Sequence, residues 1–352
     1  SRRLEISPTQ GPVGTTITVK VTGMGRGAFD STASVLYDNR FTGFVSTVTT
    51  GGTAVFQIRA AGAPGTHYIQ LQNASHALPY LNTEQSPPLY APGLRTEFTV
   101  TPGSSLPPPR LDWPDPGRVA PLAAAIPRTM ATGRGQGSGV TASLSSTAGT
   151  ILSKTALKVN SLGPEAPVAV FYGTAVGNDV TGWNVSDFPL GQGKADRGGS
   201  FDSTVDIPDD LGGWHSILVQ SGDKIVAEVP YYVQRSLVEV TPTRVKAGEQ
   251  FMVRIKGVGW TALDNGVAVT YDNAYVGYAC GFCCKGDTQI FLTATGGPGI
   301  HLVELYPMIY DSGQNKWPWQ YNIPQLTALQ DHPGLGLGYN LPIFRLAIEV
   351  VP

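Results

Sequence analysis

The chain has 352 residues and a formal net charge of −2, and only 14% of its residues are charged. This length is enough for two or three domains with hydrophobic cores. The charge argues against a nucleic-acid partner, because no basic stripe is present to neutralise phosphates, and no apolar run reaches the roughly 18 residues of a membrane span.

Period-two alternation of apolar and polar residues marks the first part of the chain. Such alternation is typical of half-buried strands, and clusters of Gly, Pro, Asp and Asn separate the segments. Short strands at this spacing predict an antiparallel sandwich, and we place this first domain at residues 1–102. The predicted strands are 16–21, 33–37, 53–58, 66–71 and 96–100.

Residues 103–137 are rich in Pro and Gly, which predicts an extended linker. A divergent copy of the first domain is then expected at residues 138–235. Its segments 157–163, 168–172 and 212–219 echo three stretches of the first domain. The alternative is that the same β pattern arose by convergence.

The last domain, at residues 236–352, repeats the first one closely. Residues 238–305 align with residues 4–71 without a gap at an offset of 234, and 21 of the 68 positions are identical. An ungapped match of this length indicates two copies of one domain. The predicted fold class is therefore all-β, with three tandem immunoglobulin-like β-sandwich domains.

The openings of the first and last domains resemble the IPT/TIG family of immunoglobulin-like domains. Pro8 and Gly14 precede an alternating strand that ends at Gly23, and Pro242 and Gly248 repeat this arrangement. The resemblance covers about two-thirds of the chain, and the middle copy lacks the Pro-then-Gly opening. It implies a fold but no shared catalytic residues, because such domains serve as surface repeats, spacers, binding modules or enzyme appendages.

A tyrosine and a histidine recur at matching places in the three domains. Each histidine shares a strand face with apolar residues, so the parity of the strand predicts a structural role in the core instead of a catalytic one. We expect each imidazole to be hydrogen-bonded at the end of its sandwich. The pairs are Tyr37 with His67, Tyr172 with His215, and Tyr271 with His301.

The three cysteines, Cys280, Cys283 and Cys284, all fall in one pentapeptide. A zinc site needs four ligands, and these thiols supply three. We expect a local disulfide in which Cys280 is one partner, with one sulfur left over. No nucleophile elbow, phosphate loop or metalloprotease motif occurs. Asp38 with Asp30, or Asp272 with Asp264 and Asn265, could begin a calcium site, but no Asp-x-Asp-x-Asp-Gly loop is present. No catalytic residue, metal or cofactor is predicted.

Long loops precede the last strand of the first and last domains. Long connections in compact domains are usually functional, and aromatic residues in them offer large contact area at low entropic cost. The alternative is that these loops fold back over their own or the neighbouring domain. The candidate binding residues are Tyr80, Tyr90, Tyr310, Trp317, Trp319 and Tyr321.

These features predict a non-enzymatic extracellular or cell-surface protein whose domains assemble with protein partners or with copies of the same chain. Exposed strand edges would offer one route to such contacts. A carbohydrate-binding module is one alternative, with Trp317, Trp319 and Tyr321 stacking on a glycan. An accessory subunit of an enzyme complex is another.

Overall fold

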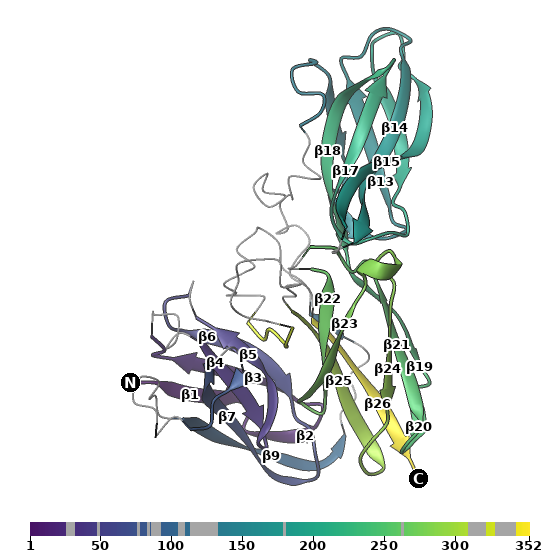
Figure 1. Ribbon diagram of the computed structural model, residues 1–352. Coiled ribbons are helices and arrows are strands. Elements are labelled where there is room, and N and C mark those ends of the chain that lie inside the picture. The colour runs from purple at the N-terminus through teal and green to yellow at the C-terminus, as the bar shows by residue number, and fades with distance from the viewer. Residues whose placement is uncertain are drawn as a thin grey trace.

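The computed structural model places three β-sandwiches along the chain (Figure 1). Nearly all regular structure in the residues that it describes is strand. These residues are 1–25, 32–47, 50–75, 78–82, 85, 93–104, 110–112, 133–178, 181–261, 264–308, 322–327 and 343–352. The predicted class of three tandem immunoglobulin-like sandwiches is confirmed.

Sandwich 1 pairs a three-stranded sheet, β1-β3-β6, with a larger sheet of order β2-β9-β7-β4-β5, to which β8 is joined through β7. Its strands are β1 (Arg3–Ser7), β2 (Gln10–Val13), β3 (Thr16–Thr22), β4 (Thr32–Tyr37), β5 (Arg40–Ser46), β6 (Ala54–Arg59), β7 (Gly65–Ser75), β8 (Leu78–Pro79) and β9 (Leu94–Ser104).

Sandwich 2 pairs β11-β13-β16 with β12-β18-β17-β14-β15. The β14–β15 hairpin extends beyond the neighbouring strand β17, which pairs with β14 only from Val168 to Gly173. The strands are β11 (Thr141–Leu144), β12 (Ala148–Thr150), β13 (Lys154–Asn160), β14 (Pro167–Asn178), β15 (Gly182–Lys194), β16 (Phe201–Asp206), β17 (Gly213–Ser221) and β18 (Lys224–Gln234).

Sandwich 3 pairs β19-β21-β24 with β10-β26-β25-β22-β23, and β20 pairs with β26. Strand β10 (Arg110–Asp112) lies within the range that we predicted as linker. The domain boundaries themselves stay a prediction. The other elements are β19 (Ser236–Thr241), β20 (Arg244–Lys246), β21 (Gln250–Lys256), β22 (Gly266–Tyr271), β23 (Ala274–Cys280), a 3₁₀ turn (Phe282–Cys284), β24 (Thr288–Thr293), β25 (Gly299–Pro307) and β26 (Ile343–Val351).

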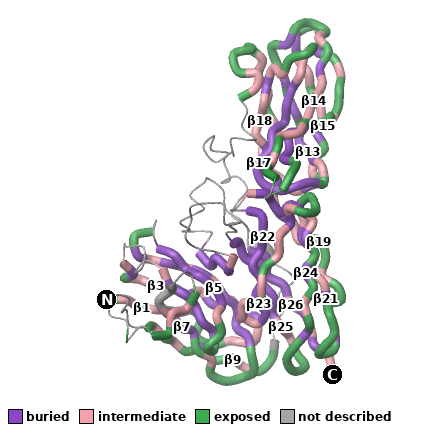
Figure 2. Tube along the Cα trace, viewed as in Figure 1, coloured by how far each residue is buried: buried purple, intermediate pink, exposed green. Residues whose placement is uncertain are grey.

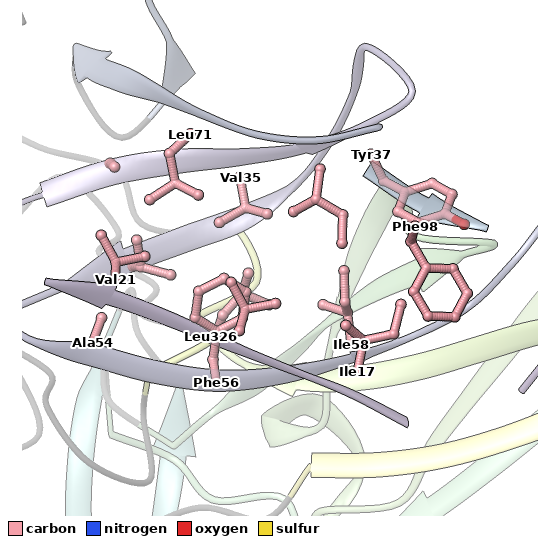
Figure 3. Packing of buried hydrophobic residues seen from close by; sticks show 14 of the residues in the cluster. Ile17, Val21, Val35, Tyr37, Ala54, Phe56, Ile58, Leu71, Phe98 and Leu326 are labelled. Atoms are coloured by element: carbon pink, nitrogen blue, oxygen red, sulfur yellow. The ribbon is translucent and has the colours of Figure 1, made fainter. Parts of the chain in front are cut away.

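Strand alternation builds each core. In β3, Ile17, Val19 and Val21 are fully buried, while the intervening residues face outward. They lie beside Phe56 and Ile58 of the neighbouring strand β6, and the side chains of the other sheet, among them Val35, Leu71 and Phe98, complete the cluster, as Figure 3 shows. The same cluster also contains side chains from outside sandwich 1, including Leu326. The core of sandwich 1 therefore continues into sandwich 3.

Sandwiches 1 and 3 lie side by side, and sandwich 2 extends away from them (Figure 1). The edge of sandwich 1 formed by β5 and β6 packs on the outer surface of the sheet that holds β22, β25 and β26. Leu302 and Tyr306 face sandwich 1 and join its cluster, whereas Val303 and Leu305 face the interior of sandwich 3. Figure 2 shows buried chain on both sides of this contact.

A buried charged network crosses the contact. The Arg59 guanidinium donates from Nε to Glu304 Oε1 at 2.6 Å and from Nη2 to the Leu346 carbonyl at 2.6 Å. From the other side, Arg345 Nη2 donates to the Gln57 carbonyl at 2.8 Å. The Arg59 and Glu304 side chains are 2% and 0% exposed. Burial of these charges costs desolvation free energy, so the folded state is stable only when each charge is paired with an opposite one.

Sandwich 2 joins sandwich 3 through a smaller apolar cluster around Trp214 and Trp260. Trp183 of the protruding hairpin lies against Trp260, with ring centroids 5.4 Å apart. At the same junction Gly212 approaches so closely that a Cβ would lie 1.7 Å from the Gly257 carbonyl oxygen. The residue at 212 must therefore be glycine for this packing to form.

The buried network gives a direct prediction. Replacing Glu304 with alanine leaves Arg59 and Arg345 without their shared carboxylate, and we expect a loss of about 3–5 kcal/mol in the free energy of unfolding. Urea denaturation measures this loss. The matched control is Glu349→Ala, which removes the exposed pair with Arg244 (70% and 43% exposed) and should cost at most about 1 kcal/mol. Equal effects of the two substitutions would contradict the role of the network.

Candidate functional site

The recurring tyrosine and histidine are stacked in all three sandwiches. The ring centroids lie 5.6 Å apart for Tyr37 with His67, 4.6 Å for Tyr172 with His215, and 5.6 Å for Tyr271 with His301. In sandwich 1 the tyrosine hydroxyl donates to the Ala61 carbonyl, just after β6, at 2.6 Å. In sandwich 3 it donates to the Thr295 carbonyl, just after β24, at 2.7 Å. The pairs therefore fix a turn to the end of the sheet.

The histidines differ in their surroundings. His301 Nδ1 lies 2.5 Å from the Asp272 carboxylate, and its Nε2 lies 2.8 Å from the Gly297 carbonyl. Since both neighbours are acceptors, only the protonated ring can donate to both. The hydrogen bond to Asp272 accordingly raises the pKa of His301 above its ordinary value. The two ring nitrogens of His67 have the same kinds of neighbour, the Asp38 carboxylate and the Ala63 carbonyl.

His215 is fully buried, and burial lowers its pKa. Its two ring nitrogens face the carbonyls of Gly173 and Leu211 at 3.0 and 2.7 Å. His67 and His301 are only 13% and 14% exposed. All three side chains are thus held by local backbone or carboxylate groups, and none is paired with a nucleophile in the hydrogen bonds of the described residues.

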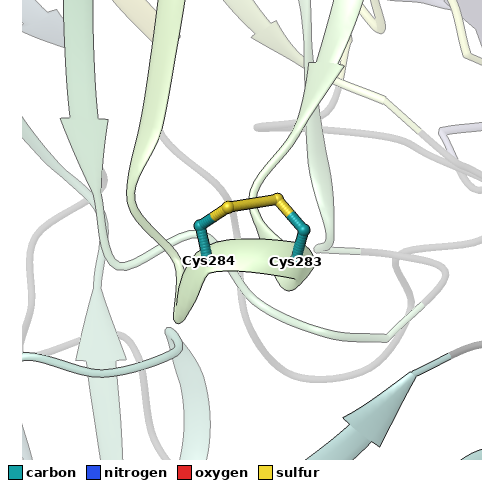
Figure 4. The surroundings of a disulfide bond; sticks show 2 residues. All are labelled: Cys283 and Cys284. Carbon is teal, nitrogen blue, oxygen red and sulfur yellow. A yellow bond between two sulfur atoms is a disulfide. The ribbon is translucent and has the colours of Figure 1, made fainter.

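The cysteine segment forms a disulfide that the sequence did not predict. The bond joins the neighbours Cys283 and Cys284 on the 3₁₀ turn, as Figure 4 shows. Cys280 was expected to be a partner, and this expectation is corrected. Cys280 ends β23, opposite Gly266 in the sheet register, whereas the two later cysteines are neighbours in the sequence and are exposed on the 3₁₀ turn.

The acidic residues considered for a cation are engaged within the protein. The carboxylate of Asp272 accepts from His301 and from the Leu302 amide. Asp264 is buried and accepts from the amide and hydroxyl of Thr261. In the described residues no group of three His, Cys, Asp or Glu is arranged to hold a metal ion. No helix in those residues is long and apolar enough to cross a membrane.

Of the six aromatic residues predicted to bind a partner, only Tyr80 falls in the described part of the chain, where it is half-buried. Tyr90, Tyr310, Trp317, Trp319 and Tyr321 lie outside the described residues. Their role therefore stays a prediction.

One described piece of the last long loop, residues 322–327, lies against sandwich 1. Its backbone pairs with β5: the Phe44 amide donates to the Pro324 carbonyl at 2.8 Å, and the Leu326 amide donates to the Phe44 carbonyl at 2.9 Å. Ile323 and Leu326 are buried there at 4% and 3% exposure. This part of the loop covers the neighbouring domain, which was the alternative that the sequence left open.

In the described residues, an apolar cluster and a buried ion pair thus form a contact between two immunoglobulin-like sandwiches. Sequence reasoning missed it, although Glu304 and Arg345 gave a signal. Each interrupts an otherwise apolar strand at an outward-facing position, as in His301-Leu302-Val303-Glu304-Leu305. A charge in such a place requires a partner from another element.

The fold and this contact define a protein of tandem immunoglobulin-like sandwiches, two of which pack on each other. Residues 4–86 match the model of the IPT/TIG domain family, so sandwich 1 is an IPT/TIG domain. No curated protein matches the chain.

Solved structures to which the chain is similar include a Salmonella α2-macroglobulin, which is 10% identical over 100% of this chain and 23% of its own, with a TM-score of 0.22. The Yersinia pseudotuberculosis adhesin InvE is 13% identical over 72% of this chain and 67% of its own, with a TM-score of 0.22. The D0-D1 domains of intimin are 16% identical over 49% and 92%, with a TM-score of 0.18. Scores this low carry no functional argument.

The His301 pair predicts a pH dependence of stability. Because the folded pKa lies above the ordinary value of 6.5, the stabilising contribution is complete below about pH 6.5 and is lost as the pH rises through the folded pKa. The buried His215 acts in the opposite direction, so the effect must be isolated by comparison.

The measurement is the difference in free energy of unfolding between the wild type and His301→Gln from pH 5 to pH 9. We expect this difference to shrink as the pH rises, and Asp272→Asn to abolish its pH dependence. A difference that stays constant over this range would contradict the proposed protonated pair.

Proposed function

We propose that the chain is a non-enzymatic structural protein of the cell surface or extracellular space, whose immunoglobulin-like domains assemble with protein partners. The packing of sandwich 1 on sandwich 3 supports this proposal most directly. That contact joins an apolar cluster, backbone pairing along β5 and a satisfied buried ion pair. These are the components of stable protein interfaces.

The side chains that could carry chemistry support the same proposal. Each histidine is hydrogen-bonded to a backbone carbonyl. Of the acidic residues that were considered for a cation, Asp272 accepts hydrogen bonds from His301 and Leu302 of β25, and Asp264 accepts from Thr261 of its own turn. The IPT/TIG match of sandwich 1 fits a role in binding or spacing. The aromatic segments around Tyr80 and Trp317 are proposed as additional contact regions.

The state of the protein in its native source tests this function. After mild chemical cross-linking, we expect the chain in a complex or polymer whose mass is a multiple of its own 37.2 kDa or includes another protein. Mass spectrometry of the cross-linked peptides identifies the contacting domains. A native chain that is monomeric and cross-links to no protein would contradict the proposal.

A triple variant, Trp317→Ala with Trp319→Ala and Tyr321→Ala, separates this function from the carbohydrate alternative. Loss of binding to insoluble polysaccharide, with protein assembly unchanged, would favour a glycan-binding role. Aromatic residues at protein contacts are frequent hot spots. We therefore expect weaker protein assembly by about tenfold or more if the loop is a protein contact.

A further inference from the structure

The contact between sandwiches 1 and 3 has two different sides. The first, here called the edge face, is the β5–β6 side of sandwich 1 and includes Thr42, Phe44, Gln57 and Arg59. The Thr42 hydroxyl donates to the Asn273 carbonyl at 2.5 Å, and the Asn273 side chain donates to the Arg59 carbonyl at 2.7 Å. Thr42 and Phe44 are 0% and 3% exposed.

The second side, here called the sheet face, is the outer surface of the larger sheet of sandwich 3. It carries Leu302, Glu304 and Tyr306 on β25 and Arg345 on β26, all buried against sandwich 1. The Asp272-Asn273 turn and residues 322–327 complete it. The two faces are different surfaces of the same fold, so the contact is heterologous.

Because sandwiches 1 and 3 are copies, each also carries the face that the other uses. The edge face of sandwich 3 is the β23–β24 side, where Val276, Tyr278 and Phe291 occupy the positions of Thr42, Phe44 and Gln57 at the offset of 234. These three side chains are 51%, 46% and 59% exposed. The equivalent of a buried docking face is therefore an exposed apolar strip.

The sheet face of sandwich 1 is its counterpart. Tyr68 and Gln70 stand at the positions of Leu302 and Glu304, and Tyr68 is 37% exposed. Arg95 pairs with Gln70 in the sheet register as Arg345 pairs with Glu304. Asn39 is exposed in the same left-handed conformation as Asn273, with φ of 64° and 63°.

The loop position agrees with this correspondence. In sandwich 3 the segment between β25 and β26 supplies Ile323, which packs on Phe44, and Leu326, which joins the core cluster of sandwich 1. In sandwich 1 the segment between β7 and β9 presents Leu78 and Leu81, which are 51% and 74% exposed. The corresponding connection of sandwich 1 therefore also carries two apolar side chains, and more than half of each is exposed.

The exposed apolar side chains concentrate on these two faces. Seven large apolar side chains are exposed among the described residues of sandwiches 1 and 3, and six belong to the two faces; Val238 on β19 is the exception. A folded monomer rarely gathers apolar surface in this way without a use for it. The six are Tyr68, Leu78, Leu81, Val276, Tyr278 and Phe291.

The polar positions are also compatible with each other. The buried pair of Arg59 and Glu304 becomes Thr293 and Gln70 at the equivalent positions. Both charges of this pair are replaced together, so neither of these two positions places a lone charge in a contact between the faces. Arg95 stays on the sheet face, where its guanidinium carbon lies 5.2 Å from the centroid of the Tyr68 ring.

We propose that the edge face of sandwich 3 packs on the sheet face of sandwich 1 of a second copy of this chain, in the manner of the contact within each chain. The inference rests on the proposed function and identifies the protein partner as a second copy of this chain. A heterologous contact of this kind leaves one of each face open, so assembly continues into a filament or closes into a ring.

The first test uses sedimentation velocity of the full chain over a range of concentrations. The wild type should show a mass that rises with concentration, and Val276→Asp with Phe291→Asp should weaken association by about a hundredfold or more. Val238→Asp is the matched control, because Val238 is 49% exposed on the opposite edge of the same sandwich. It should leave association unchanged.

The second test moves the charged pair from one interface to the other. Thr293→Arg alone should weaken association by about tenfold or more, because it places an unpaired charge in the contact. Gln70→Glu alone places its carboxylate opposite Arg95 in the same sheet and should weaken association less. The chain that carries both substitutions recreates the Arg59–Glu304 pair and should recover association to within about threefold of the wild type. Far-UV circular dichroism and unfolding midpoints confirm that the variants are folded.

Each outcome is decisive. A wild type that stays monomeric at high concentration, or association that survives both aspartate substitutions, would overturn this contact. Absence of recovery in the double charge variant would also overturn it. If native material still contains another protein bound to the chain, the proposed function stands and only the identity of the partner is wrong.

Discussion

The buried pair of Arg59 and Glu304 is the interaction on which the arrangement of the chain depends. The Arg59 guanidinium lies 2.6 Å from the Glu304 carboxylate across the interface, closer than Arg345 of Glu304's own sandwich, which lies 3.9 Å from it. Each sandwich therefore completes the polar network of its neighbour, and the apolar cluster around Leu302 and Leu326 continues across the same boundary. Sandwiches 1 and 3 consequently form one body, although sandwich 2 lies between them in the sequence.

This arrangement explains why two closely similar domains have diverged in particular places. Elements inside each copy are kept, including the stacked tyrosine and histidine and the bond from Tyr37 or Tyr271 to the backbone. The faces differ because within one chain each copy uses only one of them. Gln57 lies at the contact, whereas its equivalent Phe291 is exposed. The differences between the copies thus carry the functional information, and their common features carry the fold.

The sequence was sufficient for the features that depend on local pattern. Alternation in segments such as Thr16–Thr22 predicted strands, and the ungapped repeat predicted two like sandwiches. The interface could not be predicted in the same way, because Arg59 and Glu304 are far apart in the sequence. The residues around one of them do not indicate that the other is its partner. The prediction of the disulfide partners was wrong because strand alternation gives no sign that the bond joins the sequence neighbours Cys283 and Cys284, which lie on a 3₁₀ turn.

The central claim is that one mode of sandwich packing serves both within the chain and between chains. A three-dimensional reconstruction of the assembled protein by electron cryomicroscopy tests it most directly. The account predicts that Phe291 and Val276 of one copy lie against Tyr68 and Gln70 of the next, with the relative orientation seen between sandwiches 1 and 3. Copies joined through sandwich 2, or through any surface that leaves the β23–β24 edge exposed, would contradict it.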